Sequence, residues 1–178
     1  MGCIPPSAEK DAPEDDLKTL QRESSFYGKI TRHNPVNSRG EVVTIRQIYE
    51  FDEDLSLGAS STGVVCRAVR IADREEFALK VIHLDKVNPK DHAQLRSEIE
   101  ILKSLDHPNI VKLFETFEQD NVLYMIMELC TGGELYSRLS AAGKRFQEKT
   151  ASRIVKQMLS AVVYCHSKNI AHRDIKMA

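Results

Sequence analysis

The chain has 178 residues, of which 42% are hydrophobic and 29% are charged, the composition of an ordinary globular protein with room for one domain of typical size. Its 25 basic residues are balanced by 26 acidic residues, giving a net charge of -1, which argues against nucleic acid as a partner. The four cysteines show no Cys-x-x-Cys spacing, so we expect free thiols in a reducing compartment such as the cytoplasm, with no zinc site or disulfide framework.

Residues 1–46 are predicted to form a flexible leader. This segment is polar, is interrupted by prolines and glycines, and carries an acidic cluster at residues 14–16, a composition that does not favour a packed core. It lacks the charged-then-apolar layout of a secretory signal. No apolar run in the chain approaches the roughly 18 residues that a membrane-spanning helix needs.

The first three residues leave two interpretations open. Gly2 follows a removable Met and precedes Cys3, the arrangement that carries N-myristoylation with palmitoylation and holds a protein at a membrane through two acyl chains. The myristoylation motif requires Ser or Thr at the sixth position, where this chain has Pro6, with Ser7 one place late. The alternatives are therefore membrane association through acylated Gly2 and Cys3, or a chance match.

A strand is predicted to begin near residue 48. Tyr49, Phe51, Leu55 and Leu57 are spaced two or four positions apart, which is the period of a strand with one buried face. Residues 63–70 and 75–84 follow as second and third strands. Between the first two lies the sequence GASSTG, bounded by glycines at 58 and 63. Such a tip lets backbone N–H groups approach a phosphate, although a plain tight turn has the same composition.

The third strand has a lysine at an interior position. Lys80 lies between Leu79 and Val81, and burying an ammonium group is costly unless a carboxylate or a phosphate compensates its charge. The sequence therefore predicts an anionic partner for Lys80.

A helix that could supply this partner is predicted over residues 91–105. Leu95, Ile99, Leu102 and Leu105 recur at helical spacing, and Glu98 lies beside this apolar stripe. Two interpretations of Glu98 remain: it turns inward to Lys80, or it is an ordinary exposed glutamate. Another long amphipathic helix is predicted within residues 148–167, with a wide apolar stripe at positions 151, 154, 155, 158, 159, 162 and 163.

The order of these motifs resembles that of the eukaryotic Ser/Thr protein kinases. The resemblance rests on the glycine-rich hairpin, FALK, the helix glutamate, HPNIVKL, LYMIMELCTGGEL and HRDIK. The sequences 127–139 and 145–176 are most similar to the calcium-dependent protein kinases, within the calmodulin-dependent kinase branch. No Asp-rich calcium-binding loop occurs in the chain, so calcium sensing would require a further EF-hand region.

The resemblance implies an α+β fold. Residues 47–129 would form a five-stranded antiparallel sheet with one packed helix, the small lobe of a kinase. Residues 130–178 would form the hinge and the first two helices of an incomplete helical lobe, ending in the catalytic loop. The long apolar stripe of residues 148–167 is then expected to be exposed.

The resemblance also implies roles for individual residues. Lys80 would hold the α- and β-phosphates of ATP and pair with Glu98, Asp174 would accept the proton of the substrate hydroxyl, and Lys176 would neutralise the transferring phosphoryl group. The implied contacts of ATP, through side chains or backbone, are Leu57, Gly58, Ala59, Ser60, Ser61, Thr62, Gly63, Val65, Ala78, Lys80, Met127, Glu128, Cys130 and Glu134. Ser60 replaces the usual middle glycine of the loop, and Thr62 replaces the usual aromatic residue.

The sequence stops at Ala178, two residues after Lys176. In the family, the Asn and Asp ligands of Mg²⁺ come later, so no metal ligand is predicted here and we expect this chain alone to be inactive. Three interpretations follow: the N-terminal piece of a kinase that phosphorylates Ser/Thr of protein substrates, a non-catalytic nucleotide- or partner-binding module, or an inert fragment. The first is favoured.

Overall fold

A computed structural model describes residues 32–33, 43–60, 63–141, 143, 145–173 and 175. Its strands are β1 (Arg32–His33), β2 (Tyr49–Ser60), β3 (Gly63–Arg70), β4 (Glu76–His83), β5 (Leu113–Gln119) and β6 (Val122–Met127). Its α-helices are α2 (His92–Ser104), α3 (Leu135–Ala141) and α4 (Glu148–Ser167), and its short 3-10 helices are η1 (Ile45–Gln47), η2 (Leu84–Lys86) and η3 (Pro89–Asp91). The fold is α+β, as predicted.

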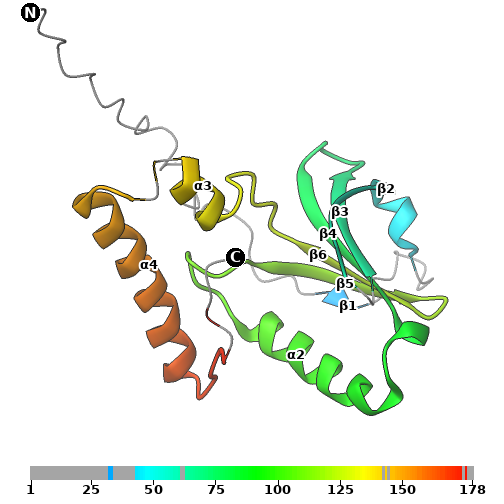
Figure 1. Cartoon of the computed structure of the whole chain (residues 1–178). Coiled ribbons are helices and arrows are strands. Elements are labelled where there is room, and N and C mark those ends of the chain that lie inside the picture. Colours follow the sequence, from blue (N-terminus) through cyan, green and yellow to red (C-terminus); the bar gives the residue numbers. More distant parts are fainter. Residues whose placement is uncertain are drawn as a thin grey trace, which may run out of the picture.

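The strands form a single sheet in the order β1-β5-β6-β4-β3-β2. The predicted five antiparallel strands are confirmed as β2 to β6. In addition, β1 pairs in parallel with the outer edge of β5. Figure 1 shows α2 packed along one face of the sheet, with α3 and α4 to the left of the sheet in this view.

Alternation along the strands builds a core on each face of the sheet, because successive side chains of a strand point to opposite faces. In β4, Leu79 and Val81 enter one core, whereas Ile82 enters the other. The first core comprises Ile45, Tyr49, Cys66, Ala68, Phe77, Leu79, Val81, Phe117 and Ile126. The second, under α2, comprises Ile82, Ile99, Leu113, Leu123 and Met125.

The turn between β5 and β6 has a local cause. Asp120 and Asn121 have positive φ angles of 51° and 60°, and two such residues form the type I′ turn whose twist matches that of paired strands. Asp and Asn tolerate this left-handed conformation better than most residues. The turn therefore fixes the register in which Gln119 lies opposite Val122.

The prediction for β2 is wrong in its second half. Tyr49 is buried and Phe51 is half-buried, but Leu55 and Leu57 are 72% and 58% exposed. The reason is that the pairing of β2 with β3 shifts register between Phe51 and Ser56 and again before Gly58. Between Phe51 and Ser56, β2 has three more residues than the paired part of β3, and this odd number turns Leu55 to the other face; Leu57 lies within the second irregularity, where the alternation is interrupted.

Part of the predicted leader contributes to the sheet and its core. Arg32 and His33 form β1, and Ile45 is only 2% exposed. The amide side chain of Gln119 holds the segment in place, since its Nε2 donates to the carbonyl of Val43 at 3.2 Å and its Oε1 accepts from the N–H of Ile45 at 3.4 Å. The rest of the leader, including Gly2 and Cys3, lies outside the described residues.

The helix α4 ends at a left-handed residue and contacts the loop after α2. Asn169 has a φ of 59°, and the N–H of Ile170 donates back to the carbonyl of Cys165 at 2.9 Å, as in a Schellman-type cap. The ring of Tyr164 stacks on His107 at 5.0 Å, and its hydroxyl accepts from the N–H of Asp106 at 2.9 Å. These contacts fix α4 beside the loop that follows α2.

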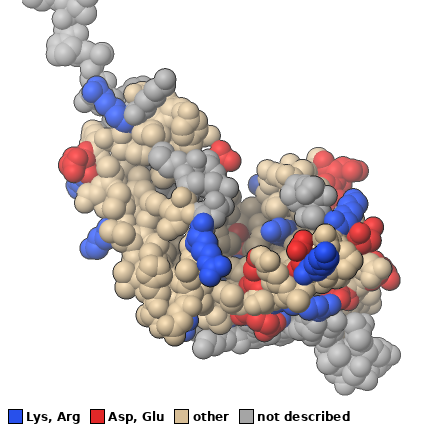
Figure 2. All heavy atoms as spheres, turned by 60° about the horizontal axis from the view of Figure 1, so that its bottom comes forward, with Lys and Arg blue, Asp and Glu red and all other residues tan. Residues whose placement is uncertain are grey.

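The predicted exposure of the apolar stripe on α4 is confirmed for its outer residues. These are Val155, Met158, Leu159 and Val163, which are 41% to 66% exposed. Figure 2 shows a broad surface with few charged side chains on the left-hand side of the molecule, whereas charges of both signs are interspersed over the right-hand side.

In the described part of the chain, no helix has the length and apolarity needed to span a membrane.

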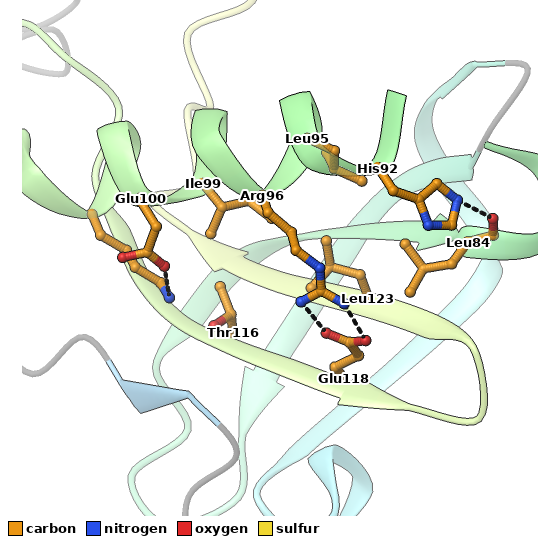
Figure 3. Close-up of a pocket in the computed structure, with 10 residues that line it drawn as sticks. Leu84, His92, Leu95, Arg96, Ile99, Glu100, Thr116, Glu118 and Leu123 are labelled. Carbon is orange, nitrogen blue, oxygen red and sulfur yellow. Dashed lines mark hydrogen bonds and ion pairs between the residues drawn. The ribbon is translucent and has the colours of Figure 1, made fainter. Parts of the chain in front are cut away.

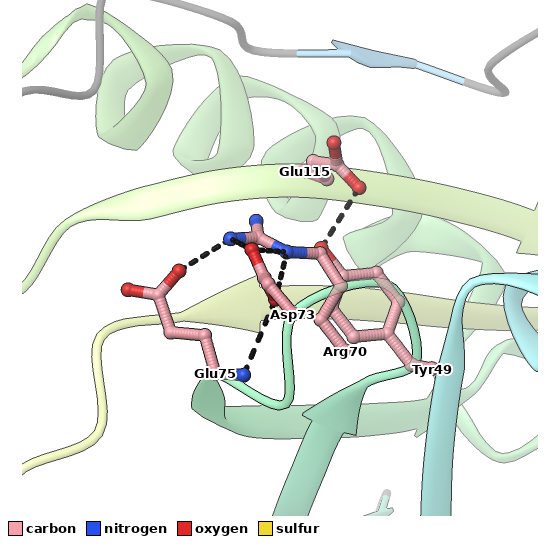
Figure 4. Close-up of polar contacts among 5 residues, drawn as sticks. All are labelled: Tyr49, Arg70, Asp73, Glu75 and Glu115. Atoms are coloured by element: carbon pink, nitrogen blue, oxygen red, sulfur yellow. Dashed lines mark hydrogen bonds and ion pairs between the residues drawn. The ribbon is translucent and has the colours of Figure 1, made fainter.

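A polar cluster joins the ends of β2, β3 and β5 (Figure 4). The hydroxyl of buried Tyr49 donates to Oε2 of Glu115 at 3.1 Å. Next to it, the guanidinium of Arg70 binds Asp73 at 2.7 Å and also pairs with Glu75. Burial, and secondly the carboxylate of Glu115, raises the pKa of Tyr49 well above its usual value.

This raised pKa predicts a loss of stability at alkaline pH. An unfolded tyrosine ionises near about pH 10, whereas the folded protein retains the Tyr49 proton. The contribution of Tyr49 to the free energy of unfolding is therefore complete below about pH 10 and falls as the pH rises further. In urea unfolding between pH 8 and pH 11, we expect Tyr49→Phe to be less stable than wild type at pH 8 and to lose less stability at higher pH.

The matched control is Tyr136→Phe, because Tyr136 is 57% exposed. This variant should lose stability at alkaline pH as wild type does. If the stability of Tyr49→Phe also fell as steeply with pH as that of wild type, the loss of stability at alkaline pH would have to come from another group.

Candidate functional site

Four of the predicted ATP contacts lie together on one face of the sheet. Lys80 is opposite Val65 on β3, while Ala78 is opposite Met127 on β6, and directly opposed residues of antiparallel strands point to the same face. Lys80 and Ala78 are two positions apart in β4, so their side chains share that face too. Ala78 is buried, and the other three are half-buried. A half-buried ammonium group thus lies beside an apolar surface.

The glycine-rich hairpin continues from this face. Gly58 pairs with Val65, Ala59 with Val64, and Ser60 with Gly63, so β2 and β3 remain paired up to the tip. Leu57, Gly58 and Ala59 are exposed. Ser61 and Thr62, together with the side chain of Ser60, lie outside the described residues.

Gly63 has a packing role that sequence analysis did not identify. A Cβ at this position would overlap the carbonyl oxygen of Val81 and would lie 2.9 Å from its carbonyl carbon. Because those atoms belong to the backbone of β4, they cannot move aside as a flexible side chain can. Glycine therefore lets the hairpin approach the strand that carries Lys80.

The predicted ion pair between Lys80 and Glu98 is wrong for this structure. Among the ion pairs of the described residues, none joins these two side chains. Glu98 is exposed, and its Oε1 accepts a hydrogen bond from Nε2 of Gln94 at 3.1 Å. Ile99 is the buried residue of α2, and Glu98, about 100° around the helix from it, faces solvent. The exposed interpretation of Glu98 is the correct one here.

The connection after β6 is fixed by backbone contacts. The N–H of Glu128 donates to the carbonyl of Lys112 at 2.9 Å, and Oε2 of Glu128 accepts from the N–H of Lys112 at 3.2 Å. An adenine contact from the Glu128 backbone would therefore use its carbonyl. Cys130 and Glu134 are both exposed, and Glu134 follows Gly133, which has a φ of 73°.

The predicted catalytic residues Asp174 and Lys176 lie outside the described residues. The preceding residues are described: His172 and Arg173 are exposed, and Arg173 has a φ of 62°. In the described part of the chain, no group of three or more His, Cys, Asp or Glu side chains is arranged to hold a metal ion.

A cavity of about 460 Å³ lies apart from these residues, between α2 and the strands β5 and β6 (Figure 3). None of the predicted ATP contacts lines it. Its lining residues are Leu84, His92, Leu95, Arg96, Ile99, Glu100, Lys103, Thr116, Glu118 and Leu123. No local sequence pattern indicates this cavity, because helical and strand residues far apart in the chain form it together.

Comparison with known proteins identifies the family. Residues 51–178 match the protein kinase domain. The chain is 42% identical over 132 residues to calcium-dependent protein kinase 5 of Plasmodium berghei and 39% identical over 132 residues to myosin light chain kinase A of Dictyostelium discoideum. Each alignment covers 74% of this chain, but 23% of the first relative and 44% of the second.

The chain spans under half the length of both relatives. It belongs to the protein kinase family, in the branch of the calcium-dependent and calmodulin-dependent kinases.

Proposed function

We propose that this chain forms the ATP-binding part of a protein kinase that phosphorylates serine and threonine residues of protein substrates. The observation that carries the proposal is the placement of Lys80 on one sheet face with Val65, Ala78 and Met127. The apolar side chains suit a flat purine, and the ammonium group suits phosphate oxygens. Because the family uses a nucleotide triphosphate, ATP fits this arrangement.

Under this proposal each of the site residues has a separate role in phosphoryl transfer. Lys80 binds the phosphates, the backbone of residues 57–63 covers them, and Asp174 and Lys176 act at the substrate hydroxyl and the transferring group. Mg²⁺ would neutralise the charge on the phosphates. None of the predicted site residues is expected to bind this ion. A lysine two positions after the catalytic aspartate is the spacing of Ser/Thr kinases, which supports that specificity.

Binding of Mg-ATP by the full chain tests the nucleotide site. A ligand at a hundred times its Kd stabilises the folded protein by about 2.7 kcal/mol, so wild type should show a clear rise in Tm with Mg-ATP. Lys80→Met should remove most of this rise because it deletes the phosphate contact. The control Lys86→Met changes an exposed lysine in η2 and should keep it. No rise in wild type would contradict the proposed nucleotide site.

A second candidate function is a nucleotide- or partner-binding module without catalysis. It is favoured by the separation of Lys80 from Glu98 and by the exposed apolar stripe on α4. Transfer of the γ-phosphate to a Ser/Thr peptide library separates the two candidates. Transfer that is lost in Asp174→Asn supports the kinase, whereas Mg-ATP binding without transfer supports the module.

We also propose that residues 1–46 attach the protein to a membrane. Acylation of Gly2 and Cys3 would hold the protein at the cytoplasmic face of a membrane, because two acyl chains give stable anchoring where one does not. Incorporation of a myristate analogue that is lost in Gly2→Ala would support this proposal. Calcium sensing is proposed only for a protein that also carries an EF-hand region.

A further inference from the structure

The loop that runs from β6 to α3 (Figure 1) is held at its α3 end by an arginine. Arg138 lies in the middle of α3, and its Nε donates to the carbonyl of Gly132 at 2.6 Å. Its backbone N–H donates to the carbonyl of Glu134 at 3.1 Å. Two donors of the same residue therefore bind the carbonyls on either side of Gly133.

The side-chain contact of Arg138 is of a kind that can restrain a loop. Hydrogen bonds from a guanidinium group are charge-assisted, and such bonds are shorter and stronger than those between neutral groups. Arg138 is half-buried, so its hydrogen bond to Gly132 is weakened by water less than one at a fully exposed site. We therefore expect this contact to fix the carbonyl of Gly132 relative to α3.

The residue between the two bound carbonyls needs such a restraint. Gly133 has a φ of 73°, in the left-handed region that glycine adopts without the steric cost of other residues. Glycine leaves this conformation as readily as it enters it, so the backbone at Gly133 does not fix its own direction. The direction in which the chain enters α3 therefore depends on the two hydrogen bonds of Arg138.

The other end of the loop is fixed by a different element. The N–H and a carboxylate oxygen of Glu128 form hydrogen bonds with the backbone of Lys112. Residues 129–131 span the interval between this anchor and Gly132. Three of the predicted ATP contacts, Glu128, Cys130 and Glu134, belong to the loop, and Glu134 is the one that lies next to the anchor supplied by Arg138.

We propose that Arg138 is a positioning residue for the nucleotide, because it holds the loop so that the carboxylate of Glu134 accepts hydrogen bonds from the ribose hydroxyls of ATP. This inference rests on the proposed nucleotide site. Arg138 itself does not contact ATP. A site built to bind a hydroxyl group rejects an analogue that lacks it, so the positioning by Arg138 should appear as a preference for the intact ribose.

The affinities of the full chain for two nucleotides test this role. Wild type should bind Mg-ATP more tightly than the Mg complex of 2′,3′-dideoxy-ATP, measured as Kd by calorimetry. In Arg138→Ala the ratio of the two Kd values should fall roughly threefold or more, because a hydrogen bond to a charged group is lost. Alanine is the better helix former, so a weaker α3 would not explain this fall.

Two further variants separate positioning from charge. Arg138→Lys keeps a charged donor and should retain part of the preference for ATP. Arg145→Ala removes the same charge at an exposed position and should leave the ratio of the two Kd values unchanged. An equal fall in Arg145→Ala would overturn the proposal, because net charge alone would then account for the effect.

A double-mutant cycle shows whether Arg138 acts through Glu134. Glu134→Ala should lose the same preference for ATP, and adding Arg138→Ala should cause no further loss, since both changes remove one interaction. Additive losses would overturn the proposal. So would a wild type that binds both nucleotides equally, or an Arg138→Ala variant that keeps the full preference.

Hydrogen exchange tests the restraint without any nucleotide. In Arg138→Ala, amides of residues 130–138 should exchange roughly threefold faster or more, whereas those of residues 92–104 should be unchanged. Unchanged exchange of the loop would overturn the role of Arg138 even in a chain that binds ATP. Faster exchange in a chain that binds neither nucleotide would support the restraint by Arg138 and would contradict the proposed nucleotide site.

Discussion

Gly63→Ala is expected to destabilise the folded chain by about 1 to 3 kcal/mol, the usual cost of forcing extra atoms into a packed interior. The added Cβ would meet the backbone of Val81 and would lie 3.1 Å from the Cα of Ile82. To remove this steric overlap, the hairpin of β2 and β3 would have to move away from β4. The measurement is urea unfolding of wild type and variant.

The hairpin itself provides the control. At Gly58, no atom lies within 4 Å of the point that a Cβ would occupy, so Gly58→Ala should change the stability by no more than about 0.5 kcal/mol. If the two alanine variants were equally stable, the close approach of Gly63 to β4 would be wrong. Since β4 carries Lys80, Gly63→Ala should also reduce the Tm rise caused by Mg-ATP.

Leu79→Ala is expected to cost about 2 to 5 kcal/mol, since it removes a fully buried side chain and leaves a cavity. Leu79 is 0% exposed and packs in the core formed with Tyr49, Phe77 and Phe117. That loss is a large part of the roughly 5 to 15 kcal/mol that typically stabilises a domain. Urea unfolding or thermal denaturation would measure it.

The same substitution at Leu55 is the matched control, because Leu55 is 72% exposed. Leu55→Ala should change the stability by less than about 0.5 kcal/mol. A large loss in Leu55→Ala would contradict the register shift in β2, since simple alternation places Leu55 and Tyr49 on the same buried face.

Local pattern predicted the secondary structure well where one period is maintained along an element. The helices α2 and α4 begin and end within one residue of the predicted 91–105 and 148–167, because apolar residues at three- and four-residue spacing form one continuous stripe. The strand β2 shows the limit of such a pattern. Alternation predicted burial through Leu57, but pairing with β3 breaks the register after Phe51.

In the candidate site, the sequence predicted Lys80 correctly as a lysine on a strand but did not determine which side chain pairs with it. An interior lysine on a strand indicates a compensating anion, and the motifs identified Lys80 and Glu98 as candidates. Whether the two meet depends on how α2 is rotated and placed against the sheet. The structure buries Ile99 and leaves Glu98 with Gln94.

By itself, the sequence determined the fold class, the protein kinase family and the identity of the lysine on β4, because these follow from periodicity and from motifs confined to short stretches of chain. Only the tertiary structure decided that Glu98 faces solvent, that Gly63 contacts the backbone of Val81, and that a cavity opens between α2 and β5. The physical reason is that each of these features depends on packing between segments distant in the chain, and no local pattern records the distance between them.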